Sequence, residues 1–297
     1  MKALSSLFAI SALALVPSLA TANSGVSTDV YISHSAAAAS IGPDGESADL
    51  PDGYDLNYML IDLGATYAIS DEIGLRLTLP VIMANTNTPA MGDAIPAMEM
   101  STTGLGDVGL EAHYMAKLND TASVGGMARF QMAIGEDGTT ADSVATSIGS
   151  HQIQVGIKAA LAPVDNLSLD IDAGYAMLLA QTNEGLTAKP GAVMSANLYA
   201  GYDISGVTPR LGVHYFSMGE TSAGPEGGDL VAQADTDRHA MGISADVGYA
   251  ISDTMSVNAG LGTRLIARGI YAPYGMTLSG KNVTTGMAFN LGFNAAF

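Results

Sequence analysis

Eleven charged residues lie inside runs of alternating apolar and polar residues, where a charge is unusual and therefore informative. Five bases and six acids fall on the same phase of this alternation: Arg76, Arg129, Lys158, Arg210, Arg264, Asp62, Asp107, Glu111, Asp170, Asp172 and Asp246. Two kinds of chemistry suit such a set, namely ion pairs that fill a confined space and an open ring of charges that selects ions. We favour ion pairs. The expected neighbours are Lys158 and Asp170, Arg210 and Asp246, Arg76 with both Asp62 and Glu111, and Arg129 with Glu111.

Three methionines, Met91, Met98 and Met100, gather in a stretch between two alternating runs. Thioethers bind Cu(I), and they also make an adaptable apolar lining for a hydrophobic ligand. The chain has no Cys to support a copper site, and His113 falls inside the next alternating run. We therefore expect an apolar constriction formed by these methionines, with no metal site and no cofactor, and keep copper handling as an alternative.

A serine nucleophile with a histidine base is the other chemistry to consider. Ser147, Ser150 and His151 lie close together in the sequence. Adjacent residues on a strand point to opposite faces, so His151 cannot simply activate Ser150. We expect no catalytic residues and no enzyme activity, with a lipid hydrolase as the remaining enzymatic alternative.

The end of the chain shows which elements position these residues. Counting back by twos from Phe297 gives a nearly unbroken apolar row through Phe293 to Val283, and the residues between are small or polar. A strand with this alternation offers one face to lipid and the other to water. It resembles the sorting strand of bacterial outer-membrane β-barrels, so Phe293 and Phe297 are expected to be read by the barrel-insertion machinery.

The start of the chain has the features of a secretory signal peptide. Lys2 is followed by an apolar stretch from residue 4 to residue 16 and by the small-residue cleavage pattern of residues 20–22. We expect residues 1–22 to be removed, leaving a barrel of residues 23–297. No other apolar run is long enough for a spanning helix, so a closed barrel is the membrane structure that remains.

Short turns divide the rest of the chain at regular intervals. The YAISD sequence of residues 67–71 returns at 249–253 and, in reduced form, at 202–205, and polar turns at 117–120 and 163–166 occupy equivalent places. Between these five hairpins lie longer stretches rich in Gly, Pro, Asp and Thr, near residues 36–53, 85–103, 136–150, 181–189, 220–238 and 270–280. Short turns on the periplasmic side and long loops outside are typical of outer-membrane barrels.

Eleven connections predict an all-β transmembrane antiparallel barrel of about twelve strands. We expect the strands near residues 25–35, 54–69, 73–84, 104–117, 121–135, 149–162, 167–180, 191–203, 207–218, 239–250, 255–268 and 281–297. The alternation points Tyr67, Tyr114, Tyr202 and Tyr249 outward just before the short turns, as an aromatic girdle at the membrane interface. The eleven charged residues then line the lumen.

Composition and charge exclude several classes of protein. Apolar residues make up 48% of the chain and charged residues only 13%, as expected when half of each strand faces lipid. A net charge of −18 argues against nucleic acid as a partner. The acidic loops suit contact with outer-membrane lipid and lipopolysaccharide through shared divalent cations.

The sequence from Thr103 to Tyr114 contains Gly104-Leu105-Gly106-Asp107 and follows the methionine-rich stretch. It resembles the glycine-rich strand of the outer-membrane transporters grouped as "putative MetA-pathway of phenol degradation". This resemblance implies a barrel in the outer membrane of a Gram-negative bacterium that passes small hydrophobic or aromatic solutes. A general porin and a structural or adhesin barrel are the alternatives.

Overall fold

The computed structural model describes residues 25–36, 39–41, 47–49, 52–90, 97–135, 146–147, 149–183, 185–234, 236–268, 283–285 and 287–297. The regular structure of these residues is entirely β. No helix in this part of the chain is long and apolar enough to cross a membrane. The expected signal peptide and its cleavage site lie outside the described residues, so they stay predictions.

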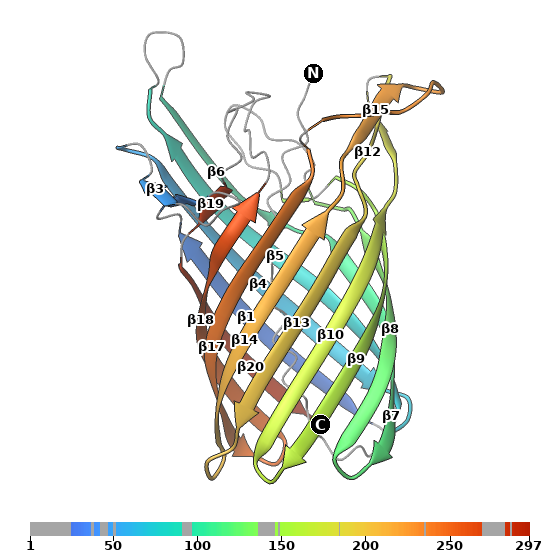
Figure 1. Cartoon of the computed structure of the whole chain (residues 1–297), viewed down its shortest axis with the longest axis vertical. Helices are drawn as coiled ribbons and strands as arrows, with labels where there is room; N and C mark the ends of the chain where they lie inside the picture. The colour runs from blue at the N-terminus through green and yellow to red at the C-terminus, as the bar shows by residue number, and fades with distance from the viewer. Residues whose placement is uncertain are drawn as a thin grey trace.

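One antiparallel sheet forms the body of the molecule (Figure 1). Its strands are β1 (Val26–Ala36), β4 (Asp55–Ala68), β5 (Ile73–Thr88), β6 (Met98–Leu105), β7 (Val108–Asn119), β8 (Ala122–Met132), β9 (Gln152–Val164), β10 (Leu167–Leu178), β13 (Val193–Tyr202), β14 (Val207–Met218), β17 (Arg238–Ser252), β18 (Met255–Arg268) and β20 (Met287–Ala296). β6 and β7 pair with successive parts of β5. Together they therefore count as one stave, meaning one strand position in the barrel wall. The sheet therefore has the predicted twelve staves.

The sheet closes on itself, which leaves no edge to face lipid. β1 pairs with β20 on one side and with β4 on the other, and each later strand pairs with the next around the wall. Closure satisfies the backbone N–H and C=O groups of the strands around the wall, which hydrocarbon cannot do. Among the described strands β6 pairs with β5 alone. The predicted fold class, a closed antiparallel barrel, is confirmed.

One extra residue interrupts the stave formed by β6 and β7. Val81 lies opposite Leu105 and Thr78 lies opposite Gly109, so two residues of β5 face three of the other stave. Such a bulge reverses the phase of the alternation. Even-numbered residues therefore face the lumen in β6, whereas odd-numbered residues face it in β7.

Short turns join the strands at one end of the barrel, the lower end in Figure 1. All five predicted hairpins are present, between β4 and β5, β7 and β8, β9 and β10, β13 and β14, and β17 and β18. In the turn after β13, Ser205 and Gly206 have φ values of 57° and 89°. This left-handed backbone allows the tight reversal.

The opposite end differs from the sequence prediction, because several stretches expected to be loops contain strands. β5 extends to Thr88 and β6 begins at Met98, which places Met98 and Met100 on a strand and not in a loop. β11 (Gln181–Asn183), β12 (Leu186–Lys189), β15 (Ser222–Pro225) and β16 (Val231–Ala232) form a second sheet, and β2 (Ala39–Ile41), β3 (Ser47–Asp49) and β19 (Val283–Thr285) form a third. The last barrel strand is correspondingly shorter than expected and begins at Met287.

The two faces of the wall differ in burial as the alternation predicts. Along β20, Met287, Phe289, Leu291 and Phe293 are exposed on the outer face. The girdle residues Tyr67, Tyr114, Tyr202 and Tyr249 are each about half exposed on this face. Phe297 donates its backbone N–H to the carbonyl of Val26 at 2.9 Å, so the sorting residue lies beside the first strand. Its recognition by insertion machinery stays a prediction.

Candidate functional site: the lumen of the barrel

The inner face of the wall holds the polar side chains that the sequence singled out. Asp62, Asp107, Glu111 and Arg210 are buried, and the remaining described members of the set are partly buried between exposed apolar neighbours. Arg264 lies in β18, but its side chain is outside the described part of the structure. Asp107 occupies the bulge between β6 and β7.

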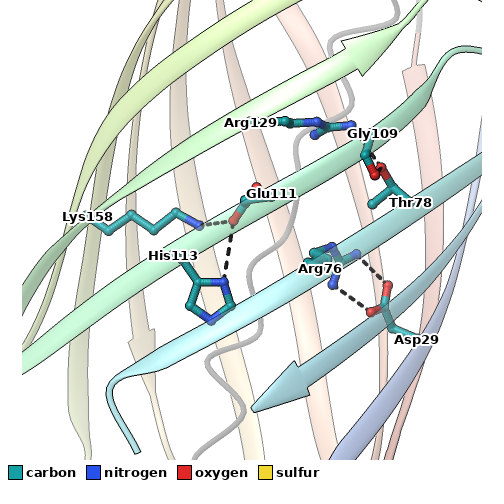
Figure 2. Close-up of polar contacts among 8 residues, drawn as sticks. All are labelled: Asp29, Arg76, Thr78, Gly109, Glu111, His113, Arg129 and Lys158. Carbon is teal, nitrogen blue, oxygen red and sulfur yellow. Dashed lines mark hydrogen bonds and ion pairs between the residues drawn. The ribbon is translucent and has the colours of Figure 1, made fainter. Parts of the chain in front are cut away.

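Two ion pairs lie on the wall formed by β1, β5, β7 and β9 (Figure 2). Arg76 donates from both terminal nitrogens to the carboxylate of Asp29, with 2.7 Å for each bond. Lys158 Nζ lies 3.1 Å from Glu111 Oε1, and His113 Nδ1 lies 3.8 Å from the same oxygen. These side chains point toward one another across strands that are not neighbours, so they link the wall across the lumen face.

A third ion pair lies on the opposite wall. Arg210 Nη2 is 3.5 Å from Asp170 Oδ2, and Arg210 Nε is 4.0 Å from Asp246 Oδ1. The Arg210 guanidinium also lies over the ring of Tyr199, 4.8 Å from its centroid, in the geometry of a cation–π contact. Arg210 is thus held between two carboxylates and an aromatic face.

Several partners differ from those expected. Lys158 pairs with Glu111 and not with Asp170, and Arg76 pairs with Asp29 and not with Asp62. Arg129 donates to the hydroxyl of Thr78 at 3.0 Å, although Glu111 lies directly opposite it in register. The strands of a barrel are tilted, so side chains at one height belong to residues that are displaced in register.

Three of these ion pairs, Asp29–Arg76, Glu111–Lys158 and Asp170–Arg210, skip one strand, and that strand presents a glycine opposite one of the partners. Arg210 and Asp246, in contrast, lie opposite each other on adjacent strands. Gly64 of β4 lies opposite Asp29, Gly125 of β8 lies opposite Lys158, and Gly201 of β13 lies opposite Arg210. Next-but-one strands are roughly 10 Å apart, which only a long side chain can bridge. Because the glycines have no side chain, the paired side chains can pass over the intervening strand and meet.

A row of hydrogen bonds crosses four strands on the second wall. Asn197 Nδ2 donates to Asp172 Oδ1 at 2.9 Å, and the other amide atom, Oδ1, lies 3.0 Å from His214 Nδ1. His214 Nε2 lies 2.8 Å from Ser244 Oγ. Since Asn197 Oδ1 can only accept, His214 Nδ1 carries a proton and donates it to Asn197, which leaves Nε2 to exchange a hydrogen bond with the Ser244 hydroxyl.

The sequence analysis missed six members of these networks: Asp29, Thr78, Asn197, Tyr199, His214 and Ser244. The alternation that placed Asp62 inside applies equally to them. In β1, for example, Val30 and Ile32 face outward, which places Asp29 inward. The outward apolar row of β1 is short, which makes the inward position of Asp29 harder to predict from the sequence.

Two apolar clusters line the lumen nearer the long-loop end. Tyr58, Leu60, Ile82, Ala84 and Met100 form one on β4, β5 and β6. The other consists of Ala176, Leu178, Val193 and Met218, with Phe216 packed against it, on β10, β13 and β14. Around the wall β8 and β9 separate the two clusters on one side, and β17, β18, β20 and β1 separate them on the other.

The predicted methionine constriction is placed differently from expectation. Met100 is only 2% exposed and belongs to the first apolar cluster, and Met98 is on the same face of β6, partly buried. Met91 lies outside the described residues. In the described part of the chain, no three His, Asp or Glu residues converge as metal ligands would.

The serine and histidine residues near the start of β9 are engaged by backbone groups. Ser150 Oγ donates to the carbonyl of Leu179, and His151 Nδ1 accepts from the N–H of Ala133 at 3.1 Å. Ser150 and His151 therefore do not form a nucleophile and base.

Residues 26–279 match the family described as "Putative MetA-pathway of phenol degradation". The chain belongs to this family. No curated protein matches the chain.

Solved structures of outer-membrane barrels share the fold. The COG4313 outer membrane channel from Pseudomonas putida F1 superposes with a TM-score of 0.67 at 15% identity, over 92% of this chain and 96% of that one. The NanC porin gives 0.50 at 13% identity, over 90% and 98%. The β domain of the Bordetella autotransporter BrkA gives 0.50 at 13% identity, over 93% and 100%. At these identities the likeness shows the fold, which is that of an outer-membrane β-barrel.

Proposed function

We propose that this member of the family is a channel for small hydrophobic or aromatic solutes. The observation that carries the proposal is the pair of apolar clusters inside the barrel at its long-loop end. Lumens of water-filled porins are polar, so apolar side chains buried on the inner face need another reason. A solute that enters from outside would meet these clusters first, and an apolar surface binds apolar solutes by excluding water.

The charged layer beneath the clusters sets a second selection. Polar and charged residues face the lumen from the middle of the strands to the short-turn end, and the acids outnumber the bases. An anionic solute would be repelled there, whereas a neutral one would not. The family description refers to phenol degradation, and phenol is a small neutral aromatic compound.

Uptake into proteoliposomes tests the proposal. We expect the refolded protein to admit benzyl alcohol faster than a pentose or benzoate, after the rate of protein-free vesicles is subtracted. Met100→Ser and Leu178→Ser, one substitution in each cluster, should reduce this preference because they wet the apolar surface. Ser101→Ala, on the opposite face of β6 from Met100, is the matched control and should leave it unchanged.

Equal rates for the three solutes in all variants would indicate a general porin. Tight Cu(I) binding that Met98→Ser and Met100→Ser abolish would instead favour metal handling.

We further propose that transport involves no chemical step on the solute. Ser244 and His214 are in hydrogen-bond contact, but Ser244 lies in mid-strand, with β14 and β18 paired on its two sides. Its backbone N–H therefore belongs to the ladder and cannot form an oxyanion hole. A fluorophosphonate probe should leave Ser244 unlabelled in the refolded protein, as judged by mass spectrometry. Labelling that is lost in His214→Gln would contradict this expectation and revive the hydrolase alternative.

A further inference from the structure

The charges of the lumen are distributed unevenly around its wall. Between the two rims the sequence places seven acids and five bases on the inner face: Asp29, Asp62, Asp107, Glu111, Asp170, Asp172 and Asp246 against Arg76, Arg129, Lys158, Arg210 and Arg264. On the wall of β10, β13, β14 and β17, three of these acids share one base, Arg210, among the described side chains of this layer. Lys158 of the adjacent strand β9 lies opposite Asp172 in register but forms its ion pair with Glu111. Arg238 lies higher, at the long-loop rim where β17 begins. One wall is thus markedly acidic.

A buried hydroxyl lies in the middle of this acidic wall. Tyr199 is 2% exposed, and its hydroxyl is buried without a hydrogen-bond partner. Its register partner on β10 is Asp170, and its ring contacts both Arg210 and His214. Leaving a buried polar atom unpaired costs about 1–3 kcal/mol, so such atoms normally face water or an ion.

Two carboxylate oxygens share this condition. Asp62 is 8% exposed, and its Oδ1 is buried without a hydrogen bond. Asp246 Oδ1 is also buried without one and lies 4.0 Å from Arg210 Nε. The Tyr199 hydroxyl and Asp246 Oδ1 on the acidic wall, and Asp62 Oδ1 on β4, are thus buried without a hydrogen bond, and Asp246 keeps only its ion-pair contact with Arg210.

We infer that the wall of β10, β13, β14 and β17 is a pathway for small monovalent cations, with Asp170, Asp172, Asp246 and the Tyr199 hydroxyl as its lining. A net negative charge in a lumen with low-dielectric walls raises the local concentration of cations and lowers that of anions. The described acids do not converge in a group of three that would hold a metal ion. Acids spread along a wall bind each cation weakly, which is what conduction requires.

The inference rests on the proposed channel function and adds its ionic selectivity. Planar bilayers with a KCl gradient measure it, because the reversal potential gives the ratio of K⁺ to Cl⁻ permeability. We expect the refolded protein to prefer K⁺. The double substitution Asp172→Asn with Asp246→Asn should lower the ratio by about threefold or more, because it removes two attracting charges and keeps the Arg210–Asp170 pair.

Two further variants make the test specific. Glu226→Gln neutralises an exposed acid after β15, outside the barrel, and should leave the ratio unchanged. Tyr199→Phe removes only the unpaired hydroxyl and should lower the K⁺ conductance while the barrel still shows heat-modifiable mobility in gels. Asp172→Asn alone serves if the double variant does not fold.

A preference for Cl⁻, or a ratio that the Asp172→Asn and Asp246→Asn changes alter no more than Glu226→Gln does, overturns the inference. Membranes without current overturn it as well. Uptake of benzyl alcohol by the same preparation then shows whether the channel function fails with it.

Discussion

Lys158 can contact Glu111 because the intervening strand, β8, has no side chain between them. Gly125 is opposite Lys158 on β8 and has no side chain, and Asp172, which is opposite Lys158 on β10, already accepts a hydrogen bond from Asn197. The ammonium therefore crosses β8 to a carboxylate whose side chain is only 6% exposed. A buried carboxylate depends strongly on its ion-pair partner.

Replacing that cation should destabilise the barrel. In Lys158→Met the volume is nearly kept but Glu111 loses its ion-pair partner, which can cost up to about 3–5 kcal/mol for a buried pair. Urea unfolding in lipid vesicles measures the loss. Lys117→Met is the matched control, because Lys117 forms an exposed pair with Asp120 at the short-turn rim. Adding Glu111→Gln to Lys158→Met should restore part of the stability, and equal midpoints for Lys158→Met and Lys117→Met would mean that the pair is hydrated.

At this scale the sequence predicts the face of each residue but not its partner. Alternation places Lys158, Glu111, Asp170 and Asp172 inside, because a charge on the lipid face would cost several kcal/mol. Which acid a base meets depends on tilt, on the glycines between, and on competing hydrogen bonds. None of these follows from the spacing along one strand.

Glycines on the inner face are spaces that neighbouring side chains fill. A Cβ on Gly64 would lie 2.5 Å from both carboxylate oxygens of Asp29 and 2.6 Å from Arg76 Nη2. A Cβ on Gly109, in the glycine-rich motif, would lie 2.5 Å from both Arg129 Nη2 and Thr78 Oγ1. The glycines thus leave space on the inner face of the strands, and the polar side chains of the networks occupy that space.

Filling one of these spaces should therefore disrupt a network rather than the strand itself. Gly64→Ala is expected to destabilise the barrel by about 1–3 kcal/mol, because the Asp29–Arg76 pair must move. Gly248→Ala on β17 is the control, since a Cβ there would meet its first neighbour at 3.8 Å. Both variants are compared by urea unfolding. A loss of stability as large in Gly248→Ala as in Gly64→Ala would attribute the effect to the backbone and contradict the proposed packing.

The elements themselves were predictable where they cross lipid and less so beyond it. Inside the membrane one face of each strand is apolar, and this pattern, together with the short turns, predicted the twelve staves and the five hairpins correctly. The extensions of β5 and β6 and the small sheet of β11, β12, β15 and β16 project beyond the barrel at its long-loop end (Figure 1). In the extensions of β5 and β6 the outward residues, such as Asn85, Asn87, Glu99 and Ser101, are polar because they have no lipid to face. The apolar outward row that marks a membrane strand is therefore absent from these sequences, which resemble loops.

The whole molecule combines an apolar zone near the long loops with a charged zone nearer the short turns. Both arise from the same inner face, where residue type changes along each strand from Leu178 to Asp170 in β10 and from Met218 to Arg210 in β14. In the proposed channel, a solute that enters at the long-loop end would meet the apolar clusters first and the charged residues second. The order would filter for compounds that are apolar and carry no negative charge.

The outer end of the molecule is also strongly acidic, which predicts a dependence on divalent cations. Glu99, Glu220, Glu226 and Asp229 are exposed there, and the whole chain carries a net charge of −18. Carboxylates and lipopolysaccharide phosphates repel each other unless Mg²⁺ or Ca²⁺ bridges them.

In vesicles that contain lipopolysaccharide we expect Mg²⁺ to raise the thermal midpoint of unfolding and EDTA to lower it, because a ligand of the folded state stabilises it by mass action. In phospholipid vesicles the effect should be much smaller, and Glu226→Gln with Asp229→Asn should reduce it in the lipopolysaccharide vesicles. Midpoints that ignore Mg²⁺ in both membranes would show that these acids are simply solvated.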